Sequence, residues 1–382
     1  MQSLYRRPLP AALVPFAAPA GRVLFDEARA DGGMEAFFQI IEQFHTQADP
    51  AFCGLSSLVV ALNALGVDPG RLWKGPWRWF SEELLDCCLP LSKVRERGIT
   101  LDEFACLARC NGARAEVSRP DTHTEADLRA VVRAAASSSV DPALIVAYDR
   151  RALGQTGEGH YSPIGGYHRA SDQVLILDVA RFKYPPHWVP LPALYAATRP
   201  VDAVTGRPRG WVLLRRNERP ASLLFTARCV GEGGFEAFAR ALRELRTVLA
   251  RAPVSDLPSA LTRLLAAAAE GFPVVLERRA LALREHADEA EALLAGLRAT
   301  AVHAAVTASA PAAWDADVAT LLLLALPADV WSPLPDPVRA AWQAVSAADR
   351  LPLAVRTESE HIQRQLADLC ALDRGGGCTR CA

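Results

Sequence analysis

The sequence lacks an excess of charge of either sign and lacks any apolar segment long enough to cross a membrane. Its 382 residues carry 42 Lys and Arg against 43 Asp and Glu, a net charge of −1. This balance does not indicate a nucleic-acid-binding or membrane-binding surface. The longest apolar run near the end, Val318–Leu326, stops at Pro327 and is far short of the ~20 residues that span a bilayer. We expect it to form a buried helix.

The chain also lacks the marks of a secreted protein. Residues 1–8 contain two arginines and no apolar segment typical of a signal peptide. The nine cysteines are an odd number in a large chain, which fits poorly with a disulfide framework. We therefore expect a cytoplasmic protein with free thiols. Nucleophilic catalysis and binding of soft metals are the two roles to weigh for them.

Two parts of the chain differ in composition and in their predicted secondary structure. Residues 1–220 carry helical patterns first and β-rich runs later, which predicts an α+β domain with a helical subdomain facing an antiparallel sheet. Helices are expected at residues 34–44 and 53–65 and after Thr100 and Thr124, where each threonine is followed three residues later by an acidic residue. Strands are expected at the following residues: 143–148, 160–167, 174–179 and 211–214.

The second part, residues 221–382, is rich in Ala, Leu, Arg and Glu. Its apolar residues recur at helical spacing, which predicts a mostly α-helical C-terminal domain. Helices are expected at the following residues: 235–250, 260–269, 277–297 and 315–326.

The segment Thr46–Ser57 places Cys53 where a loop turns into an apolar helix, with Gln47 six residues earlier. The free N–H groups at a helix start stabilise negative charge and lower the pKa of a thiol. The side-chain amide of Gln47 suits the donor that an oxyanion requires. This arrangement predicts acyl transfer through a thioester.

A cysteine nucleophile needs a base and a group that orients the base. His160 lies after glycine-rich chain at the start of an expected strand, and Asp178 is expected at the end of the next strand. Antiparallel pairing would bring the two side by side, and the carboxylate would fix the ring tautomer. The order Cys53, His160, Asp178 is the papain order, although the papain sequence pattern around the cysteine is absent.

Each residue also has an ordinary structural role to offer. A single cysteine is most often a small buried apolar side chain, a single histidine is often held by structural hydrogen bonds, and an aspartate at a strand end often caps a turn. The combination is more specific than any of its members.

Long segments of the chain resemble phytochelatin synthase, a γ-glutamylcysteine dipeptidyltranspeptidase of the papain-like superfamily. They run in order over residues 3–215. The segments are Ser3–Arg7, Ala51–Ser57, Leu62–Leu65, Asp68–Arg71, Trp73–Phe80, Leu85–Cys88, Gln155–His160, Ser162–Tyr167 and Leu175–Pro190.

The resemblance implies a papain-like fold with Cys53, His160 and Asp178 as the catalytic triad and Gln47 in the oxyanion hole. It implies that the thiolate takes γ-glutamylcysteine from glutathione and releases glycine. A second glutathione or a growing phytochelatin oligomer then accepts the acyl group. No organic cofactor is implied. Stimulation by Cd²⁺, Zn²⁺ or Cu²⁺ is expected, with a metal–glutathione thiolate as the acceptor, and metal detoxification is the expected role.

The γ-glutamyl end of glutathione carries an ammonium and a carboxylate, and it needs an acid and a base to hold it. Asp202 and Arg209 flank one turn and match the pair thought to do this in the family, although the sequence alone favours a solvated hairpin turn. Gly159 leaves backbone accessible beside His160. Arg181 and Lys183 are expected to alternate on one side of an extended segment. There they would bind the carboxylates of the acceptor, unless they are only a solvated strand face.

Cys370, Cys378 and Cys381 end the chain, the last two as a CxxC pair. Such thiols are suited to hold a soft metal, but the spacing lacks the second pair or histidine of a structural zinc site.

Two other functions stay open. A glutathione hydrolase would form the same thioester and release it to water, giving γ-glutamylcysteine and glycine. A metal-binding or sensing protein without catalysis would use the terminal cysteines alone. The sequence does not decide whether the protein forms a homodimer.

Overall fold

The computed structural model describes residues 6–70, 72–139, 141–217, 224–229, 234–251, 254–269, 272, 274–278, 287–311 and 314–373. By internal contacts the chain divides into two compact units. The first comprises Met1–Leu85 and Leu91–Glu218, and the second comprises Asp86–Pro90 and Arg219–Ala382.

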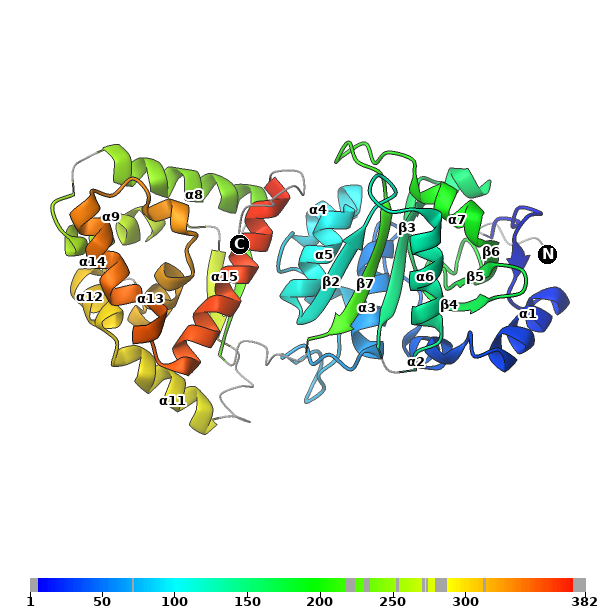
Figure 1. Ribbon diagram of the computed structural model, residues 1–382, viewed down its shortest axis with the longest axis horizontal. Coiled ribbons are helices and arrows are strands. Elements are labelled where there is room, and N and C mark those ends of the chain that lie inside the picture. Colours follow the sequence, from blue (N-terminus) through cyan, green and yellow to red (C-terminus); the bar gives the residue numbers. More distant parts are fainter. Residues whose placement is uncertain are drawn as a thin grey trace. The chain divides into compact units, whose positions relative to one another are not determined.

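The first unit is α+β and is built on a seven-stranded sheet in which every neighbouring pair is antiparallel (Figure 1). The strand order is β1-β6-β5-β4-β3-β7-β2. The strands are β1 (Val14–Pro15), β2 (Ala113–Ser118), β3 (Ala143–Asp149), β4 (Gly159–His168), β5 (Gln173–Ile176), β6 (His187–Pro190) and β7 (Gly210–Arg216).

Helices cover both faces of this sheet, α6 on one and α3 on the other (Figure 1). Successive residues of β5 point to opposite faces, as a strand requires: Val174 and Ile176 pack with α6 and α7, and Leu175 packs with α1 to α3, as does Leu177 just after the strand. The helices are α1 (Pro19–Ala30), α2 (Glu35–Gln43), α3 (Cys53–Ala64), α4 (Leu91–Arg97), α5 (Leu101–Cys110), α6 (Glu125–Ala136) and α7 (Leu191–Thr198), with 3₁₀ turns η1 (Glu82–Leu84) and η2 (Arg150–Leu153).

Local signals set several helix ends. Thr100 and Thr124 each cap a helix by accepting from the backbone N–H three residues on, and the acidic side chain there bonds back to the threonine N–H. Both predicted capping boxes are thus confirmed. Gly66 follows α3 at φ +61°, a backbone conformation that glycine adopts without steric cost.

The pairing of β4 with β5 contains an irregularity. Ile164 pairs with Ile176 but Gly166 pairs with Leu175, so β4 carries one extra residue, Gly165. A side chain at Gly165 would meet Leu177 at 2.9 Å. The extra residue is a glycine, and its missing side chain leaves room for the side chain of Leu177.

The second unit is mostly helical, as expected, but it also contains a two-stranded sheet that the sequence patterns did not predict. The expected helix at 277–297 is wrong at its start, because Glu277 and Arg278 belong to β9. The strands are β8 (Phe225–Cys229) and β9 (Val274–Arg278), and the helices are α8 (Gly234–Arg251), α9 (Leu257–Ala269), α11 (Ala287–Arg298), α12 (Ala301–Ser309), α13 (Ala316–Ala325), α14 (Asp336–Ser346) and α15 (Leu353–Asp373), with η3 (Ala328–Trp331) and η4 (Ala348–Arg350).

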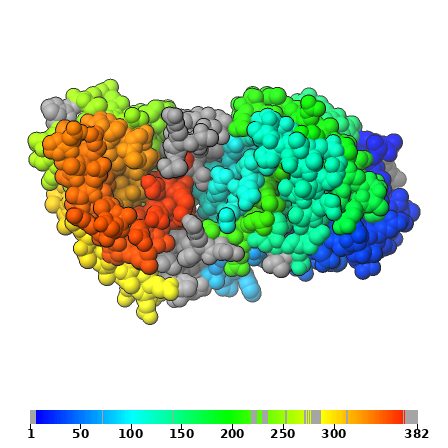
Figure 2. All heavy atoms as spheres, viewed as in Figure 1, coloured from blue at the N-terminus to red at the C-terminus, as the bar shows by residue number. Residues whose placement is uncertain are grey.

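Side chains of α15 satisfy the open edge of this small sheet. Glu358 accepts from the backbone N–H of Phe225 at 2.7 Å, and Gln365 accepts from that of Ala227 at 2.7 Å. The helix thus takes the place of a third strand. Residues of α12 to α15, yellow through red, form much of the visible face of this unit (Figure 2).

Within the described residues, no single helix is both long and apolar enough to pass as a membrane span. One bent pair, α11 with α12, passes on length and composition together.

Candidate active site

Cys53 is the first residue of α3, and its thiol is partly exposed. The preceding residue, Phe52, provides no side-chain cap to the helix, so the positive end of the helix dipole faces the thiol. Gly54 lets the first turn approach its neighbours closely, because a Cβ there would lie 2.6 Å from Ile99 and 3.4 Å from Tyr161. The rest of α3 is buried from Gly54 to Leu62, which anchors the nucleophile in the core.

His160 and Asp178 are in contact. The ring Nε2 of His160 lies 2.8 Å from Oδ1 of Asp178, so Nδ1 is the ring nitrogen left for the thiol of Cys53. In the sheet His160 pairs with Tyr148, whose ring meets the imidazole edge-on at 5.7 Å. Both His160 and Asp178 are buried.

The expected position of Asp178 at a strand end is wrong in detail. The strand β5 stops at Ile176, and Asp178 lies two residues beyond it. There its Oδ1 accepts from the N–H of Ala180 at 2.9 Å, which turns the chain away from the sheet. The same turn holds the carboxylate beside the histidine.

The charges of this cluster support one another. Burial by itself raises the pKa of the Cys53 thiol, but the charge and hydrogen bond of His160, a bond from the Tyr161 backbone and the charge of Arg150 outweigh it and lower the pKa. Burial and Arg150 by themselves lower the pKa of His160, but Asp178 and Cys53 raise it above its ordinary value. The geometry therefore favours a thiolate–imidazolium pair.

Arg150 is a member of the cluster that the sequence patterns did not reveal. It is buried at the start of η2, and its guanidinium lies 2.8 Å from Asp178 Oδ2. It also donates to Gln155, which bonds in turn to His187, and it stacks over the Tyr184 ring. The available signal was an arginine directly after the fully buried strand β3, since a buried charge is paired.

Gln47 lies close to the cluster but its amide is occupied. It is buried, and its backbone N–H donates to the carbonyl of Val179, the residue after Asp178. Both protons of its side-chain amide go to backbone carbonyls, those of Asp49 at 2.8 Å and Pro50 at 2.9 Å. An oxyanion role requires one of these bonds to be exchanged for one to the reacting carbonyl.

The structure brings Arg209 next to the triad. A Cβ at Gly159 would lie 3.1 Å from the Arg209 guanidinium, so the absent side chain leaves this approach open. Arg209 also donates to the Pro200 carbonyl at 3.0 Å. Asp202 accepts from the N–H of Val204 at 2.9 Å, so its carboxylate shapes the turn, as the alternative explanation expected.

Arg181 and Lys183 do not lie on an extended segment, so that expectation is wrong. The N–H of Lys183 bonds to the carbonyl of Ala180, which makes residues 181–183 a turn. Arg181 stacks over Phe44 at 5.3 Å. Burial and then the charge of Arg150 lower the pKa of Lys183, which places this ammonium near the triad.

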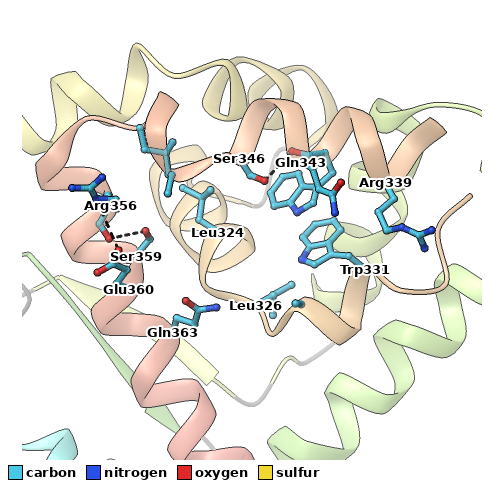
Figure 3. A pocket seen from close by; sticks show the side chains of 14 residues that line it. Leu324, Leu326, Trp331, Arg339, Gln343, Ser346, Arg356, Ser359, Glu360 and Gln363 are labelled. Carbon is cyan, nitrogen blue, oxygen red and sulfur yellow. Dashed lines mark hydrogen bonds and ion pairs between the residues drawn. The ribbon is translucent and has the colours of Figure 1, made fainter. Parts of the chain in front are cut away.

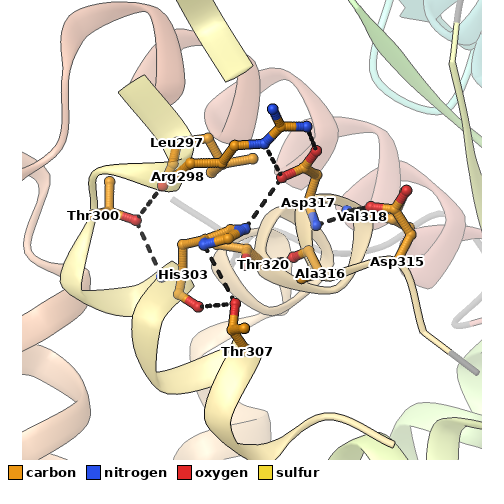
Figure 4. Close-up of polar contacts among 10 residues, drawn as sticks. All are labelled: Leu297, Arg298, Thr300, His303, Thr307, Asp315, Ala316, Asp317, Val318 and Thr320. Carbon is orange, nitrogen blue, oxygen red and sulfur yellow. Dashed lines mark hydrogen bonds and ion pairs between the residues drawn. The ribbon is translucent and has the colours of Figure 1, made fainter. Parts of the chain in front are cut away.

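A polar cluster in the second unit is built around another buried aspartate, Asp317. The Asp317 carboxylate accepts two hydrogen bonds from the Arg298 guanidinium of α11. Its Oδ1 lies 3.1 Å from Nε2 of His303 in α12 (Figure 4). Thr307 lies 3.4 Å from the other ring nitrogen but donates its proton to the carbonyl of His303. The cluster ties three helices together and does not present an activated hydroxyl.

The second unit also has a hollow of about 330 Å³. Leu324, Leu326 and the stacked pair of Trp331 and Trp342, 4.0 Å apart, form its apolar lining (Figure 3). On its rim Ser359 donates to a backbone carbonyl. These contacts do not identify a ligand.

The terminal cysteines were predicted to hold a metal. The side chain of Cys370 and all of Cys378 and Cys381 lie outside the described residues. That assignment stays a prediction.

Comparison with known proteins gives one consistent result. Residues 4–211 match the family model described as phytochelatin synthase. The chain is 52% identical to glutathione gamma-glutamylcysteinyltransferase 3 of Lotus japonicus over 231 residues, 60% of this chain and 48% of that protein. It is 50% identical to glutathione gamma-glutamylcysteinyltransferase 1 of Arabidopsis thaliana over 245 residues, 64% and 50% of the two chains.

A relative of lower identity has the same name. The chain is 44% identical to glutathione gamma-glutamylcysteinyltransferase of Schizosaccharomyces pombe over 223 residues, 58% of this chain and 54% of the relative. The chain thus spans about half the length of the curated relatives it matches.

Proposed function

The chain belongs to the phytochelatin synthase family, and we propose that it is a γ-glutamylcysteine transpeptidase that makes phytochelatins from glutathione. The observation that carries the proposal is the set of the half-buried Cys53 with the buried His160 and Asp178, in which the pKa of the thiol is lowered and that of the imidazole is raised. The printed activity of the relatives names the acyl group, γ-glutamylcysteine.

In the first step the Cys53 thiolate attacks the carbonyl carbon of the Cys–Gly amide of glutathione. The amide C–N bond breaks, and His160 gives its proton to the departing glycine amine. The α3 N-terminus and a released N–H of Gln47 stabilise the oxyanion. The product on the enzyme is a γ-glutamylcysteinyl thioester.

In the second step the α-amine of another glutathione attacks the thioester. His160 takes the proton that the amine loses, the C–S bond breaks, and the Cys53 thiolate is restored. The new amide bond lengthens the peptide by one γ-glutamylcysteine. Lys183 and Arg181 are suited to hold the carboxylates of the acceptor, and an anion there would offset burial and the charge of Arg150, which lower the pKa of Lys183.

We assign the γ-glutamyl end of the donor to Arg209 and Asp202. The Arg209 guanidinium lies against Gly159, directly before His160. Cd²⁺, Zn²⁺ or Cu²⁺ would enter as a metal–glutathione thiolate, which is a form of the substrate, because soft cations pair with thiolates. This route would serve metal detoxification in a reducing cytoplasm.

The proposed fold is papain-like, with the nucleophile on a helix and the base on an antiparallel sheet. The order of the three catalytic residues and the position of Cys53 at a helix start support this. The contribution of residues 221–382 and a homodimer remain outside the proposal.

The test is to incubate the purified full chain with glutathione, with and without Cd²⁺, and to identify products by mass spectrometry. Oligomers of γ-glutamylcysteine that end in glycine support transfer. Release of γ-glutamylcysteine and glycine alone would show a hydrolase, and no turnover with retained metal binding would favour a sensing protein. Cys53→Ser should abolish both glycine release and thioester, whereas Cys87→Ser, at a half-buried cysteine whose Sγ lies 3.8 Å from that of Cys88, should retain them.

A further inference from the structure

Glu82 is a buried carboxylate that the proposed reaction does not use. It opens η1, and its side chain is 11% exposed. One of its oxygens, Oε1, accepts from the Ser56 hydroxyl at 2.6 Å and from the Ala48 N–H at 3.3 Å, and it lies 3.2 Å from Nε2 of His45. A single atom thus joins three points of the chain.

Those three points lie on the nucleophile helix and on the loop that precedes it. Ser56 is three residues after Cys53 and lies on the same side of α3. His45 and Ala48 belong to the loop that joins α2 to α3 and carries Gln47. The chain itself joins Gln47 to Cys53 through that loop. Glu82 adds a non-covalent link between the loop and the helix that begins at Cys53.

The other side of the loop is also fixed. The N–H of Gln47 bonds to the carbonyl of Val179, next to Asp178. The loop is therefore held to the end of the triad strand by Gln47 and to the nucleophile helix by Glu82. Donors for an oxyanion act only when they are held to within a fraction of an ångström of the developing charge.

We propose that Glu82 is a positioning residue that sets the loop of residues 45–48, and with it Gln47, against the nucleophile helix for stabilisation of the oxyanion. The inference rests on the proposed acyl transfer and adds to it a residue that touches neither substrate nor reacting atoms.

The electrostatics agree with a permanent tie. Burial alone raises the pKa of Glu82, but hydrogen bonds from His45 and Ser56 outweigh it and lower the pKa to about 2. The bond to Glu82 is in turn the largest influence on His45 and raises its pKa, against burial and the charge of Arg181. The carboxylate is therefore ionised wherever the thiolate can form.

Three reagents separate the possible effects of Glu82→Gln. Iodoacetamide alkylates the thiolate without forming an oxyanion. p-Nitrophenyl acetate forms one: the thiolate takes the acetyl group, the ester C–O bond breaks, and p-nitrophenolate leaves. Glutathione requires the oxyanion and recognition of the γ-glutamyl group as well.

For Glu82→Gln we expect an unchanged rate of iodoacetamide alkylation. The p-nitrophenolate burst and the first turnover of glycine release should slow by about 10- to 100-fold, part of the 10²- to 10³-fold loss known for removal of one oxyanion donor. The KM for glutathione should change by less than about twofold, because uniform binding is untouched.

Ser56→Ala is the second variant, since it keeps the carboxylate and its other two contacts and is less apt to disturb folding. It should show the same pattern with a smaller loss. The matched control is Glu27→Gln, which breaks another Glu–His pair, with His168 at 2.9 Å. His168 lies eight residues along β4 from His160, about 26 Å at the rise of a β-strand, so none of the three rates should change.

Equal losses with all three reagents in a folded Glu82→Gln protein would overturn the proposal, since the residue would then act on the thiol itself. Unchanged rates with all three would overturn it as well. If the wild-type protein releases no glycine from glutathione but the contrast between iodoacetamide and the ester holds, the proposed function fails and the positioning role stands.

Discussion

Asp178 is a single buried carboxylate between two cations. It faces His160 on one oxygen and Arg150 on both, with separations of 2.8 to 3.0 Å. Burial alone raises its pKa, but His160 and Arg150 outweigh burial and lower it. The carboxylate thus keeps its charge in the core, and the imidazole keeps its proton.

The first prediction at this scale concerns the pH range of the thiolate–imidazolium pair. The pKa of Cys53 is lowered and that of His160 is raised, and both shifts favour the thiolate–imidazolium pair. Alkylation of Cys53 should therefore begin below the ordinary thiol pKa of about 8.5. kcat/KM should fall as pH drops through the pKa of Cys53 and again as pH rises through that of His160.

A stopped-flow alkylation profile and a kcat/KM profile check this. Asp178→Asn removes a group that raises the pKa of His160, so the alkaline limb should move to lower pH. A thiol that titrates at the ordinary cysteine pKa would contradict the assignment of the pair.

The second prediction concerns the effect of Arg150 on the pH profile. Its charge lowers the pKa of both Cys53 and His160. Arg150→Gln should therefore move both limbs of the kcat/KM profile to higher pH, whereas Asp178→Asn moves only the alkaline limb downward. The protein should also lose about 3–5 kcal/mol of stability, since one partner of a buried pair is removed.

Urea unfolding and the same pH profile test this prediction. Arg151→Gln is the matched control, because Arg151 is the neighbouring arginine and its side chain is 63% exposed. Limbs that move apart, or that stay in place, would contradict the stated role of Arg150.

At the scale of elements, two helical glycines should respond in opposite ways to alanine. Gly54 in α3 leaves no room, since a Cβ would lie 2.6 Å from Ile99, and overpacking of a core costs about 1–3 kcal/mol. Gly296 in α11 has its nearest neighbour, Pro352, at 3.5 Å. Alanine there should stabilise by up to about 1 kcal/mol through helix propensity.

Thermal or urea unfolding of Gly54→Ala and Gly296→Ala measures both. Adding Ile99→Val to Gly54→Ala should restore part of the loss, because it removes one of the two clashing carbons. If both alanine variants changed the free energy of unfolding equally, helix propensity and not packing would determine their stability.

The elements that the sequence revealed are those with strong local signals. The two capping boxes, the helix that follows Cys53 and the buried runs that became β3 and β7 follow from short-range chemistry. The short strand β6 is buried on both faces and ends at Pro190, so its sequence shows no alternation of apolar and polar residues. Glu277 and Arg278 looked helical because β9 is too short to show a period of two.

The proposed catalytic triad could be predicted from the sequence because each member combines residue type with position, and the family resemblance joined them. Arg150 and Glu82 were not, because their roles depend on partners 28 and 26 residues away in the chain. Pairing of buried charges is decided by the tertiary fold, and single-chain patterns do not encode which partner a charge will meet.

At the scale of the whole molecule, acidic groups with lowered pKa values couple stability to pH. Burial opposes ionisation of Glu82 but His45 and Ser56 lower its pKa to about 2, and bonds from Arg129 lower that of Asp172. Both bind protons more weakly when folded than when unfolded. Their contribution is complete above the unfolded carboxylate pKa of about 4 and is lost as pH falls through the folded values.

We therefore expect the free energy of unfolding to fall steadily below about pH 5. Urea midpoints measured at a series of acidic pH values test this. The decline should be shallower in Glu82→Gln, which has no carboxylate to protonate at that position, and parallel profiles for the two proteins would contradict the role given to Glu82.

The extra residue in β4, Gly165, has a consequence for how the molecule tolerates change in length. Side chains alternate along a strand, so His160 faces Asp178 only because the count of residues between the bulge and the histidine has the correct parity. Loss of one residue between 160 and 166 would turn the imidazole to the opposite face with every chemical group still present. Insertions in the turn between β4 and β5, beyond the bulge, leave that parity intact. We therefore expect activity to require the number of residues between His160 and the bulge as strictly as it requires the nucleophile.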